Sequence, residues 1–193
     1  MAHIESTENG VRVVLSDGSV EEGDIVIGAD GVHSVVKSQM WEYASKADPK
    51  AIPESDKTAM FTEFGGLFGV SKQKDSFGLG PGDQHVVHGH GVTKLFFTQP
   101  GLAYWALVFK DEFSSPPKKR KAGEEDCEAV AQRFADTPLT EKLKFGDLWE
   151  TRTRYGLLNV EEGILSKWHA GRMVLVGDSA HKVGTIPISE HRT

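Results

Sequence analysis

The sequence has little of several features that define protein classes. Its 193 residues include one cysteine, Cys127, so an internal disulfide is impossible. The presence of a single cysteine is consistent with a reducing compartment, and we expect a cytoplasmic protein. No apolar run is long enough to cross a bilayer, and the opening MAHIESTENG lacks the apolar core of a signal peptide. A net charge of −6 argues against a general nucleic-acid partner.

Several catalytic and binding motifs are also missing. The sequence contains no Gly-x-Ser-x-Gly nucleophile elbow, no Walker phosphate loop and no Gly-x-Gly-x-x-Gly dinucleotide fingerprint. His85, His88 and His90 cluster, but their spacing on a strand does not put all three on one face, and no companion ligand stands nearby. We therefore expect no metal site. With 38% hydrophobic and 26% charged residues, the chain can still bury a core.

The stretch Gly171–Lys182, GRMVLVGDSAHK, is the most informative in the chain. Met173–Val176 is a short apolar run typical of a buried strand, and Gly177-Asp178 follows at once. A glycine there permits a tight turn or close approach to a ligand. Asp178 is then placed at the carboxyl end of the strand, where open α/β sheets bind ligands. The alternative is that Asp178 only caps a following helix.

A second corner of the same kind occurs near the amino terminus. Val11–Leu15 and Val20–Ile27 flank an Asp-Gly pair, which predicts a hairpin. The second arm ends in Gly28–Ser34, GADGVHS, before a predicted helix that extends to about residues 40–43. Asp30 can orient backbone amides or contact a phosphate-bearing ligand through water. Ser34, Lys37 and the helix start suit an anion.

The middle of the chain has a different composition. Residues 45–58 are polar and contain two prolines, which suggests a connection between domains. Residues 60–109 contain β-branched and aromatic runs, which predict an antiparallel sheet that builds a pocket for an apolar substrate. Most of its aromatic side chains are expected in the core. A short amphipathic helix is predicted over Glu128–Ala135, and a strand over Tyr155–Val160.

A basic run, Lys118–Lys121, follows two prolines and is similar to a nuclear-import signal. The acidic residues Glu124, Glu125 and Asp126 come soon after it and offset its charge. We therefore favour a solvated loop over a nuclear or nucleic-acid-linked role.

The two corners together carry a family resemblance. Gly28–Ser34 resembles the "DG" motif of flavoprotein aromatic hydroxylases and related monooxygenases, and Gly171–His181 resembles their "GD" motif. The surrounding sequence is similar to fungal FAD-dependent monooxygenases of secondary metabolism, including the epoxidases of indole-diterpene and meroterpenoid pathways. The resemblance extends from Val11 to Pro187.

The resemblance implies an α/β fold with an antiparallel sheet. Residues 1–48 and 155–193 would form part of a Rossmann-like FAD-binding domain, and 49–154 an inserted substrate domain. It implies hydroxylation or epoxidation of an apolar substrate with FAD, NAD(P)H and dioxygen. Because the cofactor supplies this chemistry, no acid/base or nucleophile set is expected. The implied cofactor-binding residues are Asp178 and Gly177, at the ribityl chain, and Asp30, Gly28 and Gly31, near the pyrophosphate.

The chain also departs from the family pattern. The glycine-rich unit that cradles the FAD pyrophosphate is missing, and Lys37 stands where the DG motif usually carries arginine. After Pro187 the sequence lacks the family's glycine-rich loop. We expect a form truncated at both ends that binds FAD weakly, if at all. It would then act with a protein partner that supplies the other half of the site, or be a non-catalytic interaction protein derived from the fold.

Overall fold

The computed structural model describes residues 3–89, 91–118 and 120–184, so His90, Lys119 and Pro187 lie outside the described residues. The chain divides into two compact units. The described part of unit 1 is residues 3–61 and Glu161–Gly184, and that of unit 2 is Thr62–Val160 without residues 90 and 119. The assignment of residues 1–48 and 155–193 to the cofactor and 49–154 to the substrate stays a prediction.

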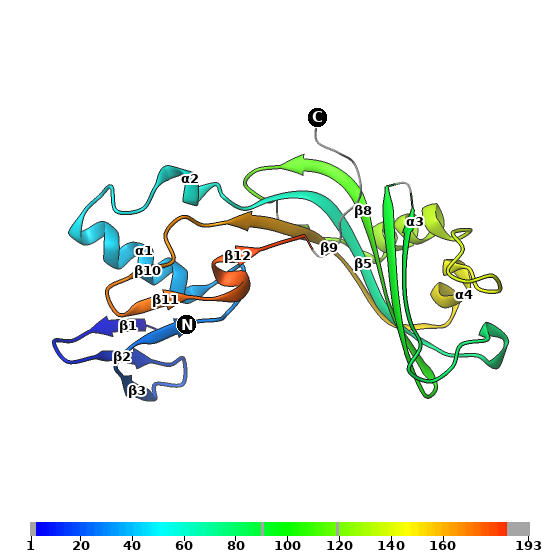
Figure 1. The fold of residues 1–193 in the computed structure, drawn as a ribbon, viewed down its shortest axis with the longest axis horizontal. Coiled ribbons are helices and arrows are strands. Elements are labelled where there is room, and N and C mark those ends of the chain that lie inside the picture. The colour runs from blue at the N-terminus through cyan, green and yellow to red at the C-terminus, as the bar shows by residue number, and fades with distance from the viewer. Residues whose placement is uncertain (1–2, 90, 119, 185–193) are drawn as a thin grey trace. The chain divides into compact units, whose positions relative to one another are not determined.

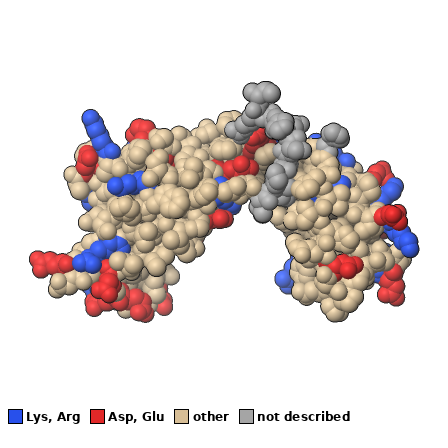
Figure 2. All heavy atoms as spheres, viewed as in Figure 1, with Lys and Arg blue, Asp and Glu red and all other residues tan. Residues whose placement is uncertain are grey.

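Unit 1 begins with an antiparallel sheet of β1 (His3–Ser6), β2 (Val11–Val14) and β3 (Val20–Gly23). The predicted hairpin is confirmed, and Gly18 takes the positive φ of 85° in its turn. Its second arm is shorter than expected, because β3 ends at Gly23 and the next strand joins another sheet. Figure 2 shows acidic side chains gathered over this sheet, which carries the exposed Glu21 and Glu22.

The second sheet of unit 1 has the order β10 (His169–Ala170), β11 (Met173–Leu175), β4 (Val26–Gly28). Strands β11 and β4 are parallel, as an α/β fold requires. Helix α1 (Val35–Ala47) packs beside this sheet (Figure 1). The predicted helix is thus confirmed and is longer than expected. The core of unit 1 is formed by Ile4, Met40, Ala44, Ile52, Leu165, Ala170, Met173, Leu175 and Ala180.

The polar stretch 45–58 is more than a connection. It holds the end of α1 and helix α2 (Glu54–Lys57). Asp56 is buried, and its carboxylate accepts hydrogen bonds from the N–H groups of Ser166 and Lys167 at 2.8 Å each. The stretch is therefore fixed within unit 1 by a satisfied buried carboxylate.

Unit 2 is built on a curved sheet with the strand order β9-β5-β8-β7-β6 (Figure 1). The strands are β5 (Phe61–Lys72), β6 (Gln84–Gly89), β7 (Val92–Gln99), β8 (Leu102–Ser114) and β9 (Arg152–Ile164). Four of them fall in the predicted sheet, and their pairings from β5 to β6 are antiparallel. Strand β9 is longer than predicted, and its end in unit 1 pairs with β12 (His181–Lys182).

Helices cover one face of the unit 2 sheet. They are α3 (Glu124–Phe134) and α4 (Phe145–Glu150), and a single-residue bridge between Pro138 and Lys144 stands where a helical turn was expected. Because side chains alternate along a strand, this face receives Phe96, Trp105 and Phe109, whereas the neighbouring residues point to the other face. The helix-covered face is therefore the core of unit 2.

Within the described residues, no helix has both the length and the hydropathy to span a membrane.

Candidate functional site

The structure brings the two glycine–aspartate corners of unit 1 together. Leu175 of β11 lies beside Gly28 of β4 in the parallel register, so both strands end at the same edge. The N–H of Val176 donates to Gly28 O at 3.0 Å. The hydroxyl of Ser179 is fully buried and donates to the same carbonyl at 2.5 Å. Each corner therefore holds the other in place.

Asp30 organises the start of helix α1. Its carboxylate accepts hydrogen bonds from the hydroxyl of Ser34 and from the N–H groups of Val35, at 2.7 Å, and Val36, at 3.2 Å. Partial burial by itself raises the pKa of Asp30, but the bonds from Ser34 and the backbone outweigh it and hold that pKa below its ordinary value. Of the two roles predicted for Asp30, the structure shows the orientation of backbone amides.

The start of α1 is not an open anion site. Ser34 is the N-cap residue, and its hydroxyl accepts from the N–H of Lys37 at 2.8 Å. With Val35 and Val36 bonded to Asp30, these N–H groups already have partners within the chain. The Lys37 ammonium donates to Val32 O at 2.6 Å, and burial lowers its pKa against the opposing effect of Glu161 and Asp30. The expectation of an anion at this helix start is therefore wrong.

Asp178 has a different environment from Asp30. It lies in the 3-10 turn η2 (Gly177–Ser179) immediately after β11, and its side chain is 59% exposed. Among the described residues, its one polar side-chain contact is with Lys182 Nζ, at 3.7 Å. The alternative that Asp178 caps a helix is wrong, because the turn has no side-chain cap and strand β12 follows it. The carboxylate therefore has acceptor capacity left for a ligand.

The three predicted glycines have two different roles. A Cβ on Gly28 would lie 2.8 Å from Val36 Cβ and 2.9 Å from Leu175 Cδ2, so Gly28 permits α1 to pack on the sheet. Gly31 and Gly177 have φ values of 80° and 61°, and no heavy atom lies within 4 Å of a Cβ built on either. These two positions keep backbone accessible at the edge where the corners meet.

The second candidate site lies in unit 2, on the face of the sheet opposite the helices. A cavity of about 650 Å³ opens there, and its lining is almost entirely apolar. Small residues in its middle, Ala106 and Gly156, create the hollow, and a Cβ on Gly156 would meet nothing within 4 Å. The pocket is lined by Phe68, Gly69, Val70, Leu95, Phe97, Tyr104, Trp105, Ala106, Val108, Arg154, Tyr155, Gly156, Leu158 and Val160.

The histidines of β6 do not converge. His85 stacks on the ring of Phe96, with centroids 4.4 Å apart, whereas His88 Nδ1 lies 3.2 Å from Thr93 Oγ1. The paired residues Phe96 and Thr93 point to opposite faces of β7, so these two histidines also do.

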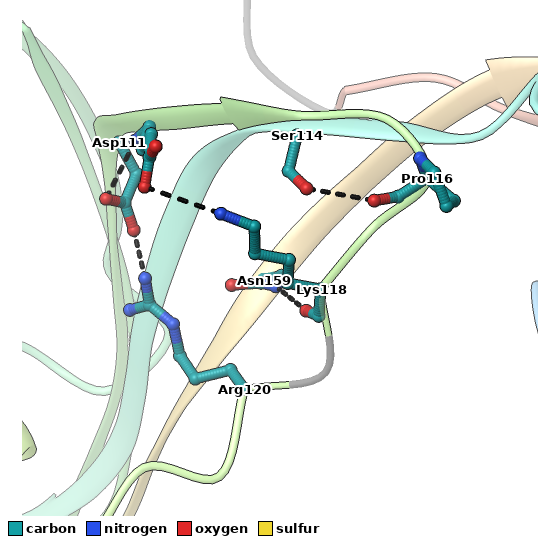
Figure 3. A network of polar contacts seen from close by, with 7 residues as sticks. Asp111, Ser114, Pro116, Lys118, Arg120 and Asn159 are labelled. Carbon is teal, nitrogen blue, oxygen red and sulfur yellow. Dashed lines mark hydrogen bonds and ion pairs between the residues drawn. The ribbon is translucent and has the colours of Figure 1, made fainter.

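The basic run is held against the unit 2 sheet (Figure 3). Arg120 pairs with Asp111, and Lys118 Nζ lies 3.9 Å from the carboxylate of Glu112. The side chain of Asn159 on β9 donates to Lys118 O at 2.6 Å. These contacts partly neutralise the run, in keeping with a surface loop.

Two residues were missed by the sequence interpretation. No sequence pattern pointed to Ser179, because its hydroxyl donates to the carbonyl of Gly28, which is distant in the sequence. Arg154 stands outside the predicted strand Tyr155–Val160. The signal that could have found it is the alternation of Arg154, Gly156, Leu158 and Val160, which places all four on one face.

Comparison with known proteins agrees with this arrangement. No family model matches the chain. The chain is 35% identical over 186 residues to the FAD-dependent monooxygenase andE of Emericella variicolor, covering 95% of this chain and 39% of that protein. It is 36% identical over 177 residues to the FAD-dependent monooxygenase ausM of Penicillium brasilianum, covering 90% and 37%. The chain thus spans well under half the length of these curated relatives.

Solved structures share the fold. Klebsiella pneumoniae HpxO, solved with FAD and uric acid, matches 93% of this chain at a TM-score of 0.58 and 18% identity, over 42% of its own chain. The 2,6-dihydroxypyridine-3-hydroxylase of Arthrobacter nicotinovorans matches 93% at a TM-score of 0.62 and 15% identity, over 48% of its chain. The fold is therefore the expected α/β arrangement with an added antiparallel sheet, as in FAD-binding hydroxylases. By sequence, the chain is a homologue of the fungal FAD-dependent monooxygenases and corresponds to a segment of them.

Proposed function

We propose that this chain is the part of an FAD-dependent monooxygenase that holds the ribityl side of the flavin and the apolar substrate. The reaction would be hydroxylation or epoxidation of an apolar secondary metabolite with NAD(P)H and dioxygen. The observation that carries the proposal is the parallel pairing of β4 and β11, which brings both glycine–aspartate corners to one edge. Open α/β sheets bind their ligands at such edges.

Some residues at this edge would contact the flavin directly, and others would only support those that do. Asp178 is exposed and weakly paired, so it can accept hydrogen bonds from the ribityl hydroxyls. Gly177 and Gly31 leave room for close approach of a ligand to the backbone. Asp30 and Gly28 would act indirectly: Asp30 fixes the start of α1, and Gly28 lets α1 reach the sheet.

FAD, when bound, would supply the redox chemistry and the activation of dioxygen. The protein itself would bind the cofactor and the substrate, orient the substrate and exclude water from it. The pocket of unit 2 suits the orientation of the substrate and the exclusion of water, because its apolar lining favours a desolvated substrate. No side chain of the described residues needs to act as a nucleophile.

A protein partner is part of this proposal. Strand β4 is the last strand of its sheet in the described residues, and Ile25 just before it and Ile27 within it are 57% and 58% exposed. An edge strand presents unpaired N–H and C=O groups, and parallel sheets are usually covered on both faces. The edge at β4 and its exposed isoleucines therefore suit a further strand of a dinucleotide-binding segment. We also keep the expectation of a cytoplasmic location.

The same exposed edge favours a second candidate function. The chain would then be a non-catalytic interaction protein, with β4 and its exposed isoleucines as the binding surface and no retained flavin. The two functions make opposite predictions about FAD.

The deciding measurement is the visible absorbance spectrum of the purified chain after incubation with FAD and desalting. The flavin function predicts that the wild type keeps some flavin absorbance despite the missing glycine-rich unit and that Asp178→Asn keeps much less, because the amide presents one acceptor oxygen in place of two. Asp17→Asn, in the exposed β2–β3 turn, is the matched control and should retain flavin. Equal retention by Asp178→Asn and wild type would contradict the assigned role. A folded, colourless wild type would favour the interaction protein, and co-purification of a partner would be the next measurement.

A further inference from the structure

The pocket of unit 2 has one polar end, which the proposed function leaves unexplained. Side chains of four strands share its face, because the alternation along β9, β5, β8 and β7 places them there. In one cross-strand row, Phe97 pairs with Tyr104 and Tyr104 with Val70. On β9, the hydroxyl of Thr153 donates to Val70 O at 3.1 Å, so Arg154, the next residue, belongs to this end.

Apolar side chains dominate the remainder of the pocket, and the hydroxyl of Tyr155 is already bonded to Glu124. Leu95 pairs with Ala106, and Ala106 with Phe68, in the next row on the same face. Val108, Leu158 and Val160 also line the cavity and carry no polar side-chain atoms. The lining is therefore divided along the strands into an apolar body and an end marked by Arg154 and Tyr104.

Arg154 has no hydrogen bond or ion pair among the described residues, unlike the other arginine of β9. Arg152 lies 3.3 Å from a carboxylate oxygen of Glu128, stacks on Trp149 and donates to its carbonyl. The hydroxyl of Tyr104 has a single long contact, 3.5 Å, with Gln99 Oε1. A guanidinium and a phenol are thus available at one end of an apolar cavity, and together they suit an anionic oxygen group.

We propose that this pocket binds an amphipathic small molecule with a carboxylate or acidic enol at Arg154 and Tyr104 and a hydrocarbon skeleton along Phe68, Leu95 and Leu158. This inference rests on the proposed role of the pocket as the substrate site and narrows its substrate class. An arginine pairs with a carboxylate in a bidentate geometry, which fixes the orientation of the ligand as well as adding affinity. The apolar body contributes through burial of hydrocarbon and selects no particular skeleton.

The test compares a fluorescent polyene fatty acid, cis-parinaric acid, with its uncharged methyl ester, by fluorescence titration of the full chain without FAD. We expect the wild type to bind the acid about tenfold more tightly than the ester at neutral pH and low salt, with a smaller ratio at high salt. Arg154→Gln should weaken binding of the acid about two- to fivefold and leave the ester unchanged. Arg133→Gln, an exposed arginine of α3 outside the pocket, is the matched control and should behave like the wild type.

A second variant locates the probe. Gly156→Leu places a side chain in the hollow, where the glycine has open space, and should weaken acid and ester alike by at least tenfold. Equal wild-type affinity for acid and ester, or an unchanged preference in Arg154→Gln, would overturn the anionic head group. Failure of the wild type to bind either probe, or binding insensitive to Gly156→Leu, would overturn the pocket as a ligand site. The assay needs no flavin, so a colourless chain that still prefers the acid would refute the flavin proposal alone.

Discussion

The two glycine–aspartate corners have similar sequence patterns but different structural environments. Each follows a short apolar strand, and the two strands are neighbours in one parallel pair. At the first corner the aspartate is committed to Ser34, Val35 and Val36 and begins a helix. At the second, Asp178 is exposed with one weak ion pair, and a 3-10 turn and a strand follow. The first corner is therefore structural support, and the second has the capacity to bind a ligand.

The strongest test of this difference is at Gly28, where both corners meet. Gly28→Ala should destabilise the protein by about 2–3 kcal/mol, because the new methyl group overlaps Val36 and Leu175 in a packed site. The measurement is the free energy of unfolding in urea. Gly156→Ala is the matched control, since its methyl group meets open space, and it should change stability by less than about 0.5 kcal/mol. Similar losses in both variants would show that Gly28 is not a packing requirement.

The next largest effect should come from Asp30. Asp30→Ala removes the acceptor for Ser34 and two N–H groups of α1, and we expect a loss of about 1–2 kcal/mol. Asp178→Ala should cost less than about 0.5 kcal/mol, because an exposed pair with Lys182 contributes little. Urea unfolding of the two variants in parallel makes the comparison. A larger loss for Asp178→Ala would reverse the roles assigned to the two corners.

The pH dependence of stability separates the corners further. The folded-state pKa of Asp30 lies below its ordinary value, so its stabilising contribution is complete above the unfolded-state pKa, about 3.9. It is lost as the pH falls through the folded-state pKa. The stability difference between wild type and Asp30→Asn should therefore be greatest near neutral pH and shrink below about pH 4. A difference independent of pH would show that the charge of Asp30 does not contribute.

A smaller loss of stability than at Gly28 or Asp30 is expected at Gly177, next to Asp178. Gly177→Ala puts a side chain at a φ of 61° with no neighbour within 4 Å, so only backbone strain of about 1 kcal/mol is expected. Flavin retention should nevertheless fall clearly, because the methyl group blocks close approach of the flavin to the backbone. Unchanged retention in a variant with this small loss of stability would remove Gly177 from the cofactor site.

Local sequence signals predicted a large part of this fold. The Asp-Gly turn, the helix after Ser34 and the β-branched runs of unit 2 each depend on neighbours a few residues away, and all three were confirmed. The predictions failed where distant residues decide. The hairpin arm ended at Gly23 because the next residues pair with β11, and the polar stretch 45–58 is fixed because Asp56 binds the backbone of Ser166.

The sequence by itself determined that two corners exist, that the chain resembles flavin-dependent monooxygenases, and that an antiparallel sheet separates the corners. Only the tertiary structure decided which aspartate is available to a ligand, because that depends on the donors that folding brings to each carboxylate. It also decided that Arg154 joins the apolar pocket, because a side chain's face depends on the register of β9 with its neighbours. Residue type sets the chemistry that a side chain can perform, and long-range packing sets whether that chemistry is already satisfied.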